Sequence, residues 1–555
     1  MGNIEQKRDV VDNNIWVSKK RDQTRDLDSL PLVDRSLIDY SKYHQYIGHA
    51  GVKYSMAVQA TRGCPYRCFY CDIYKTTEFH FRRSDNNLID EINLLHDLGI
   101  RRIEFIDDIF NVNAKQFIRF FEHVIKNNMN MSFFFPTGLK GDLLTKDMID
   151  LMVEGGSVGV NLSLEHASPR MQEIMRKKLN VDILHENLDY ITSKYPQVIL
   201  TLNAMHGFPT ETEDEAFETL NYIRSIKWID FPYLHNVRIF PGTELEHFAL
   251  EVGVPREVIE ASQDMSYHEM APSLPFDPKF TASIRTIFLR EYVLNKERLL
   301  SVLPRQLEQF SEEELDQKYN SYFPTQRITT VRDVVDFAGL KWEDIQPEVL
   351  FEEESVAVPN IYTDCEEAFH VDHDQEPEID VLLIDMSSYF TTDRDNREYN
   401  VIEPPLGLMT LQSYVNRALP GRVSGRIIKS RIDFDSYEEL VELVRDRAPD
   451  IIGIRAMTFY KGFFHDSISE LRKAGFTTPI IAGGPYPTAS YNEVLEDENL
   501  DLVAVGEGEQ TLVDVLTAMM ENGNVLPEKK VLKTISGLAF KSEDEELIPA
   551  KISVA

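Results

Sequence analysis

Three of the four cysteines in this chain, Cys64, Cys68 and Cys71, lie in one short loop at CxxxCxxC spacing. The loop follows an apolar, strand-like run, Tyr54–Ala60. Cysteine thiolates are the usual ligands of iron–sulfur clusters, and close spacing lets one loop wrap an inorganic core. Three thiolates would leave one iron of a four-iron cluster open to a small molecule. The alternatives are buried thiols or a zinc site, but zinc usually takes four ligands in two pairs, and no suitable second pair follows.

The loop resembles the motif of the radical SAM superfamily, which has an aromatic residue, here Tyr70, before the last cysteine. The resemblance implies that the three cysteines hold a [4Fe-4S] cluster whose open iron binds S-adenosylmethionine (SAM). It also implies that one electron, from a donor such as flavodoxin or ferredoxin, cleaves SAM to a 5′-deoxyadenosyl radical.

Elements that could position this loop follow it in a regular order. Strand candidates alternate with helical segments such as Leu88–Leu98 and Phe117–Ile125, which predicts a partial (β/α)6 TIM-like barrel over residues 54–250, within an α/β fold. Barrels carry their chemistry at the carboxyl ends of the strands. The expected strands are Tyr54–Ala60, Arg102–Ile106, Met131–Phe135, Ser157–Leu164, Val198–Met205 and Tyr233–Ile239.

Acidic residues and a serine lie at the ends of the second and fourth expected strands. Asp107 and Asp108 stand where members of the family contact the methionine amino group of SAM, although acids also cap helices. Ser163 and Glu165 resemble the ribose-binding strand, where a carboxylate suits ribose hydroxyls because it only accepts hydrogen bonds.

Two later segments complete the resemblance. Arg176 or Lys177 stands where family members often hold a cation against the SAM carboxylate, and a solvated helix face explains either residue equally well. Gly207 opens a Gly-Phe-Pro-Thr-Glu-Thr run that looks like the adenine-contacting turn. Tyr70 precedes the last cysteine and is included in the expected SAM site.

Strand–helix alternation resumes over residues 379–555 and predicts a doubly wound, flavodoxin-like sheet. Ligands of such sheets bind outside the carboxyl ends of the strands. The expected strands are Ile379–Asp385, Arg422–Ser430, Ile451–Arg455, Pro479–Ala482 and Leu502–Val505, and the expected helices are Gly407–Leu419, Tyr437–Arg447, Gly462–Ala474 and Glu509–Asn522.

Taken together, the ends of these strands resemble the cobalamin-binding domain of cobalamin-dependent radical SAM enzymes. Cobalamin mutases carry a cobalt-ligating histidine in a DxHxxG motif, and Ser387–Asn396 has none, as in many radical SAM members. A degenerate domain that binds nothing is the alternative. The residues implied for cobalamin are Ser387, Ser388, Pro405, Leu406, Gly407, Met457, Thr458, Gly483, Gly484, Pro485, Gly506, Glu507, Gly508 and Glu509.

Three remaining regions lack this alternation. We expect an N-terminal linker-like segment at 1–53, a helical extension at 251–350, with Ile284–Leu300 and Val331–Phe337 its clearest helices, and an acidic, solvated linker at 351–378. Cys365 is expected to be a solvent-exposed thiol in that linker. Because cobalamin domains usually precede the barrel, the order here resembles a circular permutation.

Composition narrows the function. The 555 residues are 43% hydrophobic and 27% charged and carry a net charge of −34, which disfavours nucleic acid and anionic membranes as partners. The sequence shows no membrane span and no signal-like amino terminus, so a cytoplasmic enzyme acting on a small molecule is expected. Four cysteines leave too few thiols for a second four-iron cluster.

The family resemblance therefore predicts a radical SAM enzyme that, with cobalamin, methylates an unactivated carbon of a small-molecule or natural-product substrate. One alternative is a rearrangement, cyclisation or epimerisation in which cobalamin is a spectator or absent. Another is a non-catalytic iron–sulfur sensor or scaffold, but a ribose-binding carboxylate weighs against it.

Overall fold

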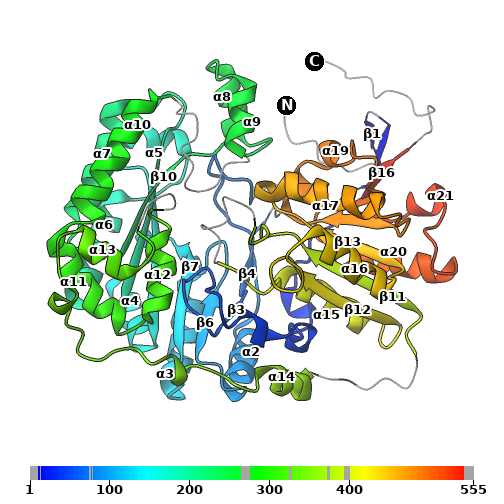
Figure 1. Ribbon diagram of the computed structural model, residues 1–555, viewed down its shortest axis with the longest axis horizontal. Helices are drawn as coiled ribbons and strands as arrows, with labels where there is room; N and C mark the ends of the chain where they lie inside the picture. Colours follow the sequence, from blue (N-terminus) through cyan, green and yellow to red (C-terminus); the bar gives the residue numbers. More distant parts are fainter. Residues whose placement is uncertain are drawn as a thin grey trace.

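The computed structural model describes residues 10–12, 14–19, 21–73, 77, 79–263, 275–323, 328–369, 371, 376–392 and 401–542. Two α/β units stand side by side, one coloured from blue to green and the other from yellow to red (Figure 1). Parts of the expected loop Ser387–Asn396 lie outside the described residues.

The first unit contains a six-stranded parallel sheet whose strands follow one another in chain order, as the predicted barrel requires. The sheet is open, with β3 and β10 at its edges. All six predicted strands are confirmed, with ends that differ by a few residues. They are β3 (Ser55–Val58), β6 (Arg102–Phe105), β7 (Ser132–Leu139), β8 (Ser157–Glu165), β9 (Ile199–His206) and β10 (Phe231–Asn236).

Crossover helices cover one face of this sheet. Phe105 and Phe135 stack at 5.4 Å between ring centres, and Phe120 meets Phe105 edge-on at 5.3 Å, so an aromatic layer joins helix to sheet. On the other face the side chains are polar: Asn203 donates to Asn161 Oδ1 at 3.0 Å. The helices are α2 (Asp85–Asp97), α3 (Ala114–Lys126), α4 (Lys146–Glu154), α5 (Pro169–Met175), α6 (Val181–Lys194) and α7 (Glu213–Ser225); a two-stranded ribbon, β4 (Thr61–Arg62) with β5 (Phe81–Arg82), flanks the cysteine loop.

The helical extension differs from the prediction at one point. The helix expected over Ile284–Leu300 is interrupted, because Asn295 caps a new helix by accepting a hydrogen bond from the Arg298 backbone N–H at 3.1 Å. Arg298 is fully buried and donates to the carbonyl of Ile229 at 3.0 Å, which anchors the extension to the barrel. The segments are α8 (Glu244–Glu251), α9 (Arg256–Gln263), α10 (Pro278–Phe288), the π-helical turn η5 (Leu289–Val293), α11 (Lys296–Leu307), α12 (Glu312–Asn320) and α13 (Val331–Phe337).

The second unit has five parallel strands in the order β12-β11-β13-β14-β15, which is the flavodoxin-like order 2-1-3-4-5. Its predicted strands and helices are confirmed to within a residue or two. They are β11 (Ile379–Asp385), α15 (Leu406–Ala418), β12 (Val423–Lys429), α16 (Tyr437–Arg447), β13 (Ile451–Arg455), α17 (Lys461–Lys473), β14 (Ile480–Gly483), β15 (Leu502–Ala504) and α20 (Glu509–Glu521), with the short helices α18 (Pro485–Ala489), α19 (Tyr491–Val494) and α21 (Lys529–Leu532).

Part of the expected N-terminal linker is instead a strand of this second sheet. β2 (Ile15–Val17) pairs antiparallel with β16 (Leu538–Lys541), which pairs with β15, and β1 (Val10–Asp12) adds to β2. In Figure 1 the blue β1 lies beside the red β16. Ile15 and Val17 are buried in the core of the second unit, so this segment belongs to that domain.

The expected acidic linker is also partly structured. Ile361–Phe369 forms helix α14, which contacts the turns η2 (Arg35–Leu37) and η3 (Tyr40–Tyr43). Cys365 is completely buried on this helix, so its expected exposure is wrong. The acidic side chains of α14 face solvent, while Ile361 and Cys365 pack inward. Across the described part of the chain, no helix is both long enough and apolar enough to cross a membrane.

One contact between the units depends on pH. His49 Nε2 lies 3.0 Å from Glu403 Oε2, and the His49 backbone N–H donates to Glu403 Oε1 at 2.7 Å. Burial alone would lower the pKa of His49, but Glu403 and Glu104 outweigh it and raise that pKa to about 9. His49 is therefore protonated and paired at neutral pH.

We expect a His49→Gln variant to show a flatter dependence of unfolding free energy on pH between about 6.5 and 9. Because the folded pKa is raised, this stabilisation is complete below about pH 6.5 and is lost as pH rises through about 9. The imidazole is half exposed, so the difference should stay near about 1 kcal/mol. Denaturant unfolding at several pH values measures it. Burial and the nearby Glu403 raise the pKa of Glu104 to about 7, and Glu104 titrates in both proteins. Parallel curves for the two proteins would contradict the expectation.

Candidate functional site

The cysteine loop begins at the carboxyl end of β3 and lies over the end of the first sheet. Its backbone is tied to α5, because Phe69 N–H donates to the Met175 carbonyl at 3.1 Å, and to α8, because Leu245 N–H donates to the Phe69 carbonyl at 2.9 Å. Gly63 needs its positive φ of 81°, and a Cβ there would lie 2.2 Å from the Phe79 carbonyl oxygen. The loop that carries the three thiols is therefore packed against its neighbours at several points.

The three thiols are close enough to influence one another. Burial, with a smaller contribution from the Cys68 thiol, raises the pKa of Cys64 to about 11. Burial also raises the pKa of Cys68, which Lys177 partly offsets, and that of Cys71. Among the described residues, no three His, Cys, Asp or Glu side chains are arranged to hold a single metal ion. Three partly buried thiols on one loop are the donor set that a larger iron–sulfur core takes.

Glu165 joins the cysteine loop to the end of β8. Its Oε1 accepts a hydrogen bond from the Tyr70 hydroxyl at 3.2 Å and pairs with Lys177 Nζ at 2.6 Å. A bulge between Ser163 and Glu165, with a φ of 63° at Glu165, turns this carboxylate toward the loop. Tyr70, Glu165 and Lys177 thus meet beside Cys68.

Arg176, by contrast, lies outside this group. It is about half exposed and pairs with Glu244 on α8. Of the two cations that sequence places near the SAM carboxylate, Lys177 is therefore the one beside the cysteines.

The two aspartates after β6 have different surroundings. Asp107 is buried and accepts from the Ala60 backbone N–H at 3.0 Å and from the Thr61 hydroxyl at 2.5 Å, so it fixes the start of the cysteine loop. Burial raises its pKa to about 6. Asp108 accepts from the Gly63 N–H at 3.0 Å and lines a cavity described below.

The turn after β9 is held by buried polar groups. The N–H groups of Gly207 and Phe208 donate to Glu211 Oε2 at 2.6 and 2.8 Å. His166 Nε2 lies 2.9 Å from Glu211 Oε1, and His166 Nδ1 accepts from the Ser168 N–H at 3.1 Å. The Gly207 N–H is thus used within the turn. Ser163 lies on the polar face of β8, opposite Asn203 of β9.

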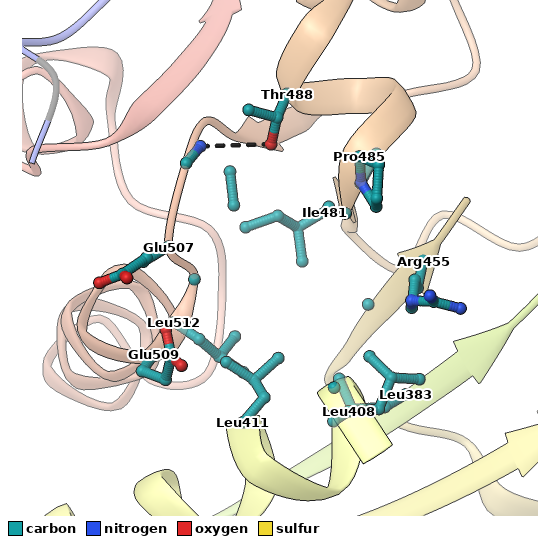
Figure 2. A pocket seen from close by; sticks show the side chains of 18 of the residues that line it. Leu383, Leu408, Leu411, Arg455, Ile481, Pro485, Thr488, Glu507, Glu509 and Leu512 are labelled. Carbon is teal, nitrogen blue, oxygen red and sulfur yellow. Dashed lines mark hydrogen bonds between the residues drawn. The ribbon is translucent and has the colours of Figure 1, made fainter. Parts of the chain in front are cut away.

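A cavity of about 330 Å³ lies between the two units. Figure 2 shows Leu408 and Leu411 of α15, Leu512 of α20 and Ile481 of β14 around it. The first unit contributes Gln59, Arg62, Gly63 and Asp108, so residues flanking the cysteine loop form part of its wall. The carboxyl ends of both sheets therefore meet at one space.

Glycines keep this cavity open. A Cβ added at Gly407 or Gly506 would meet no atom within 4 Å, and one at Gly508 would meet only Leu411 Cδ1, at 3.6 Å. Gly484 and Gly506 have positive φ angles, 97° and 94°, that disfavour other residues. The walls are largely apolar, with a few polar groups at the rim. A mostly apolar cavity with a few polar groups is typical of sites that bind small molecules or cofactors.

The cavity gathers some of the predicted cobalamin residues and not others. Gly407, Gly483, Gly484, Pro485 and the run from Gly506 to Glu509 line it. Ser387, Ser388, Pro405, Leu406, Met457 and Thr458 are outside its lining.

A buried charged network explains the position of one of these outlying residues. Ser387 donates to Asp385 Oδ2 at 2.9 Å, and Lys429 Nζ pairs with the same carboxylate at 2.7 Å. Arg455, which lines the cavity, binds the other carboxylate oxygen at 3.0 Å. Ser387 therefore supports a cavity residue without reaching the cavity itself.

Arg62 is the main residue that sequence reasoning missed. Its guanidinium lies 2.7 Å from Glu509 and 3.4 Å from Glu507, across the boundary between the units. Thr24 N–H also donates to Glu507 at 2.7 Å. Burial would lower the pKa of Arg62, but the two carboxylates outweigh it and raise that pKa. The sequence does not show that Arg62 pairs with residues more than 400 positions away. The one signal that it offers is that Arg62 lies two positions before Cys64.

We expect Arg62→Met to weaken the contact between the units by about 2 kcal/mol, because it leaves Glu507 and Glu509 partly buried without their cation. Denaturant unfolding and hydrogen exchange at residues 506–509 measure the effect. Arg332→Met is the control, since Arg332 pairs with Glu312 at an exposed site and should cost less than about 1 kcal/mol. Equal costs for the two variants would refute a special role for Arg62.

Comparison with known proteins agrees with this arrangement. Residues 58–223 match the radical SAM superfamily, and residues 397–516 match the B12 binding domain. An uncharacterized methyltransferase of Pyrococcus horikoshii is 26% identical over 41% of this chain and 48% of its own length. A tRNA-2-methylthio-N(6)-dimethylallyladenosine synthase of Aquifex aeolicus is 26% identical over 41% of this chain and 53% of its own length. The chain spans about half the length of these curated relatives.

Two solved structures align with parts of this chain at low similarity. The cobalamin-dependent S-adenosylmethionine radical enzyme OxsB, with aqua-cobalamin and SAM bound, gives a TM-score of 0.34 at 10% identity over 65% of this chain and 58% of its own. The radical SAM methyltransferase TsrM of Kitasatospora setae, with cobalamin and a [4Fe-4S] cluster, gives 0.33 at 16% identity over 39% of each chain. The two family matches imply a [4Fe-4S] cluster, SAM and cobalamin as cofactors. The two matched domains follow one another in the order predicted from the sequence. This chain therefore contains a radical SAM domain followed by a B12-binding domain.

Proposed function

We propose that this protein is a cobalamin-dependent radical SAM enzyme that methylates an unactivated carbon of a small molecule. The observation that carries the proposal is the shared cavity, in which residues flanking the cysteine loop face the glycine-lined groove of the B12-binding domain. Two cofactors held at one space can act on one substrate. When bound, SAM and the cluster supply a 5′-deoxyadenosyl radical, and cobalamin supplies a methyl group.

In this proposal the first unit holds the cluster and SAM. Cys64, Cys68 and Cys71 ligate the cluster, and Glu165, oriented by Tyr70 and Lys177, accepts hydrogen bonds from ribose hydroxyls. Asp107 and Glu211 act through the backbone, because their carboxylates hold the loop and the Gly207 turn in place. Asp108, at the cavity wall, is positioned to meet an ammonium group.

The second unit holds cobalamin in the cavity. Gly407, Gly506 and Gly508 leave room for it, and Leu408, Leu411 and Leu512 provide apolar walls that exclude water. The described part of the loop from Ser387 to Asn396 offers no histidine, so no imidazole from it reaches the metal. The rest of that loop also lacks histidine in the sequence.

A small substrate fits the net charge of −34, which repels phosphate backbones. The relative from Aquifex aeolicus is named for a tRNA modification, so the exclusion of nucleic acid remains a prediction. A rearrangement, cyclisation or epimerisation with cobalamin as a spectator is the second candidate. An electron donor such as flavodoxin or ferredoxin is a required partner in either case.

Anaerobic reconstitution with iron, sulfide and hydroxocobalamin tests the proposal. We expect a four-iron electron paramagnetic resonance signal that SAM perturbs, and a five-coordinate cob(II)alamin signal without nitrogen splitting. A cluster without bound corrinoid would favour the non-methylating candidate. A cluster that forms but does not respond to SAM would favour the non-catalytic iron–sulfur sensor or scaffold, and failure to form any cluster would reject both enzyme candidates.

A further inference from the structure

A second depression, of about 480 Å³, opens on the surface beside the cysteine loop. Its lining residues are Pro65, Arg67, Gln172, Glu173, Arg176 and Lys178. Pro65 and Arg67 lie between Cys64 and Cys68 in the sequence, so the loop itself forms one wall. The depression and the cavity between the units have no lining residue in common.

The backbone after α5 turns two cations toward this depression. Arg176 and Lys178 both have left-handed φ angles, 53° and 54°, whereas Lys177 between them pairs with Glu165 beside the cysteines. One cation of this run thus lies inside the site and its two neighbours lie outside. Such strained backbone angles in non-glycine residues are uncommon and tend to occur at functional sites.

The charge of this surface is opposite to that of the protein. Its lining has three cations and one anion, whereas the whole chain carries a net charge of −34. Arg176 is paired with Glu244. Arg67 and Lys178 are exposed, and their side chains form no ion pair or hydrogen bond with any residue that the structure describes. Uncompensated cations beside a redox centre would attract an acidic partner and speed its association.

We propose that this depression is the docking surface for an acidic electron-donor protein that reduces the cluster. The inference rests on the proposed function, because it assumes that the cysteines hold a cluster. In the step, one electron leaves the reduced flavin of the donor and enters the oxidised cluster, so the donor is oxidised and the cluster reduced by one electron each. The docked donor reaches the cluster from outside, while the cavity between the units remains free.

The test compares rates of cluster reduction by the hydroquinone of an acidic flavodoxin. Arg67→Glu combined with Lys178→Glu reverses the two unpaired charges, and we expect the second-order rate constant to fall on the order of tenfold at about 0.01 M salt. At about 1 M salt the difference should nearly vanish, because the Debye length is then only about 3 Å. Lys115→Glu with Lys126→Glu, on exposed positions of α3, makes the same charge change and should leave the rate within about twofold.

Photoreduced 5-deazaflavin separates the two proposals, since this small reductant needs no docking surface. Wild type and both double variants should show the same reduced-cluster signal with it. If they do, yet flavodoxin reduces all three proteins equally fast, the docking proposal is wrong. If deazaflavin gives no cluster signal in the wild type, the proposed function fails, and the docking proposal fails with it.

Discussion

Cys68→Ala is expected to lose the iron–sulfur cluster and to reduce 5′-deoxyadenosine formation to background. Cys68 lies between the other two cysteines in the loop and beside Tyr70 and Lys177, so its loss leaves two thiols for a core that takes three. Iron and sulfide content, the absorbance of the reconstituted protein and product formation measure the result. Cys64→Ala and Cys71→Ala should behave alike.

Cys365→Ala is the matched control, because it removes the only other thiol in the chain. Cys365 is buried on α14, away from the cysteine loop, so the variant should keep full iron content and full SAM cleavage. Its expected cost is a loss of about 1 kcal/mol of unfolding free energy from imperfect packing. A variant of Cys68 that retains a four-iron signal would show that the loop does not hold the cluster as proposed.

Gly407→Phe should abolish most corrinoid binding and leave the fold intact. A Cβ at Gly407 meets no protein atom within 4 Å, and the residue lines the cavity, so a phenyl ring there occupies space that the cofactor needs. We expect the dissociation constant for hydroxocobalamin to rise about 100-fold, which corresponds to about 2.8 kcal/mol. Equilibrium dialysis or the change in the cobalamin spectrum measures it.

Gly462→Phe provides the comparison. Gly462 is the second residue of α17, as Gly407 is of α15, and a Cβ there also meets nothing within 4 Å, but it does not line the cavity. Replacing a helical glycine costs little in either case, so both variants should unfold near the wild-type denaturant concentration. Equal corrinoid affinity in the two variants would show that cobalamin binds outside this cavity or does not bind to the protein.

Periodicity and motif order predicted most of the fold. Five parallel strands of the second unit were identified because their apolar runs are bounded by glycine turns, as at Gly483-Gly484 and Gly506. The short strands β2 and β16 were missed. Each has only three or four residues, too few to show an alternation, and their pairing joins opposite ends of the sequence. Helix α14 was missed because only Ile361 and Cys365 face inward. Two apolar positions in a segment rich in acidic residues are too few to show a helical periodicity.

The sequence names candidate site residues where a single segment carries them and names none where the two domains build a contact together. The cysteine loop, Glu165 and the glycine turns are local motifs. The choice between Arg176 and Lys177 depends on left-handed backbone angles that no motif specifies. The pairing of Arg62 with Glu509 depends on how the units dock, and composition says nothing about that. Ser387 was predicted at the cofactor but belongs to a buried network with Lys429.

The pairing of β2 with β16 has a consequence for how the chain folds during synthesis. Ser18 and Leu538 exchange hydrogen bonds across 520 positions, so the first strands emerge from the ribosome long before their partner exists. The radical SAM sheet has neighbours in chain order and should form early, whereas the second sheet closes only when its most distant strand arrives. In the interval, the edge of β2 is exposed and able to pair with another chain. Slow translation of the segment just before β16 should therefore increase aggregation of the nascent protein.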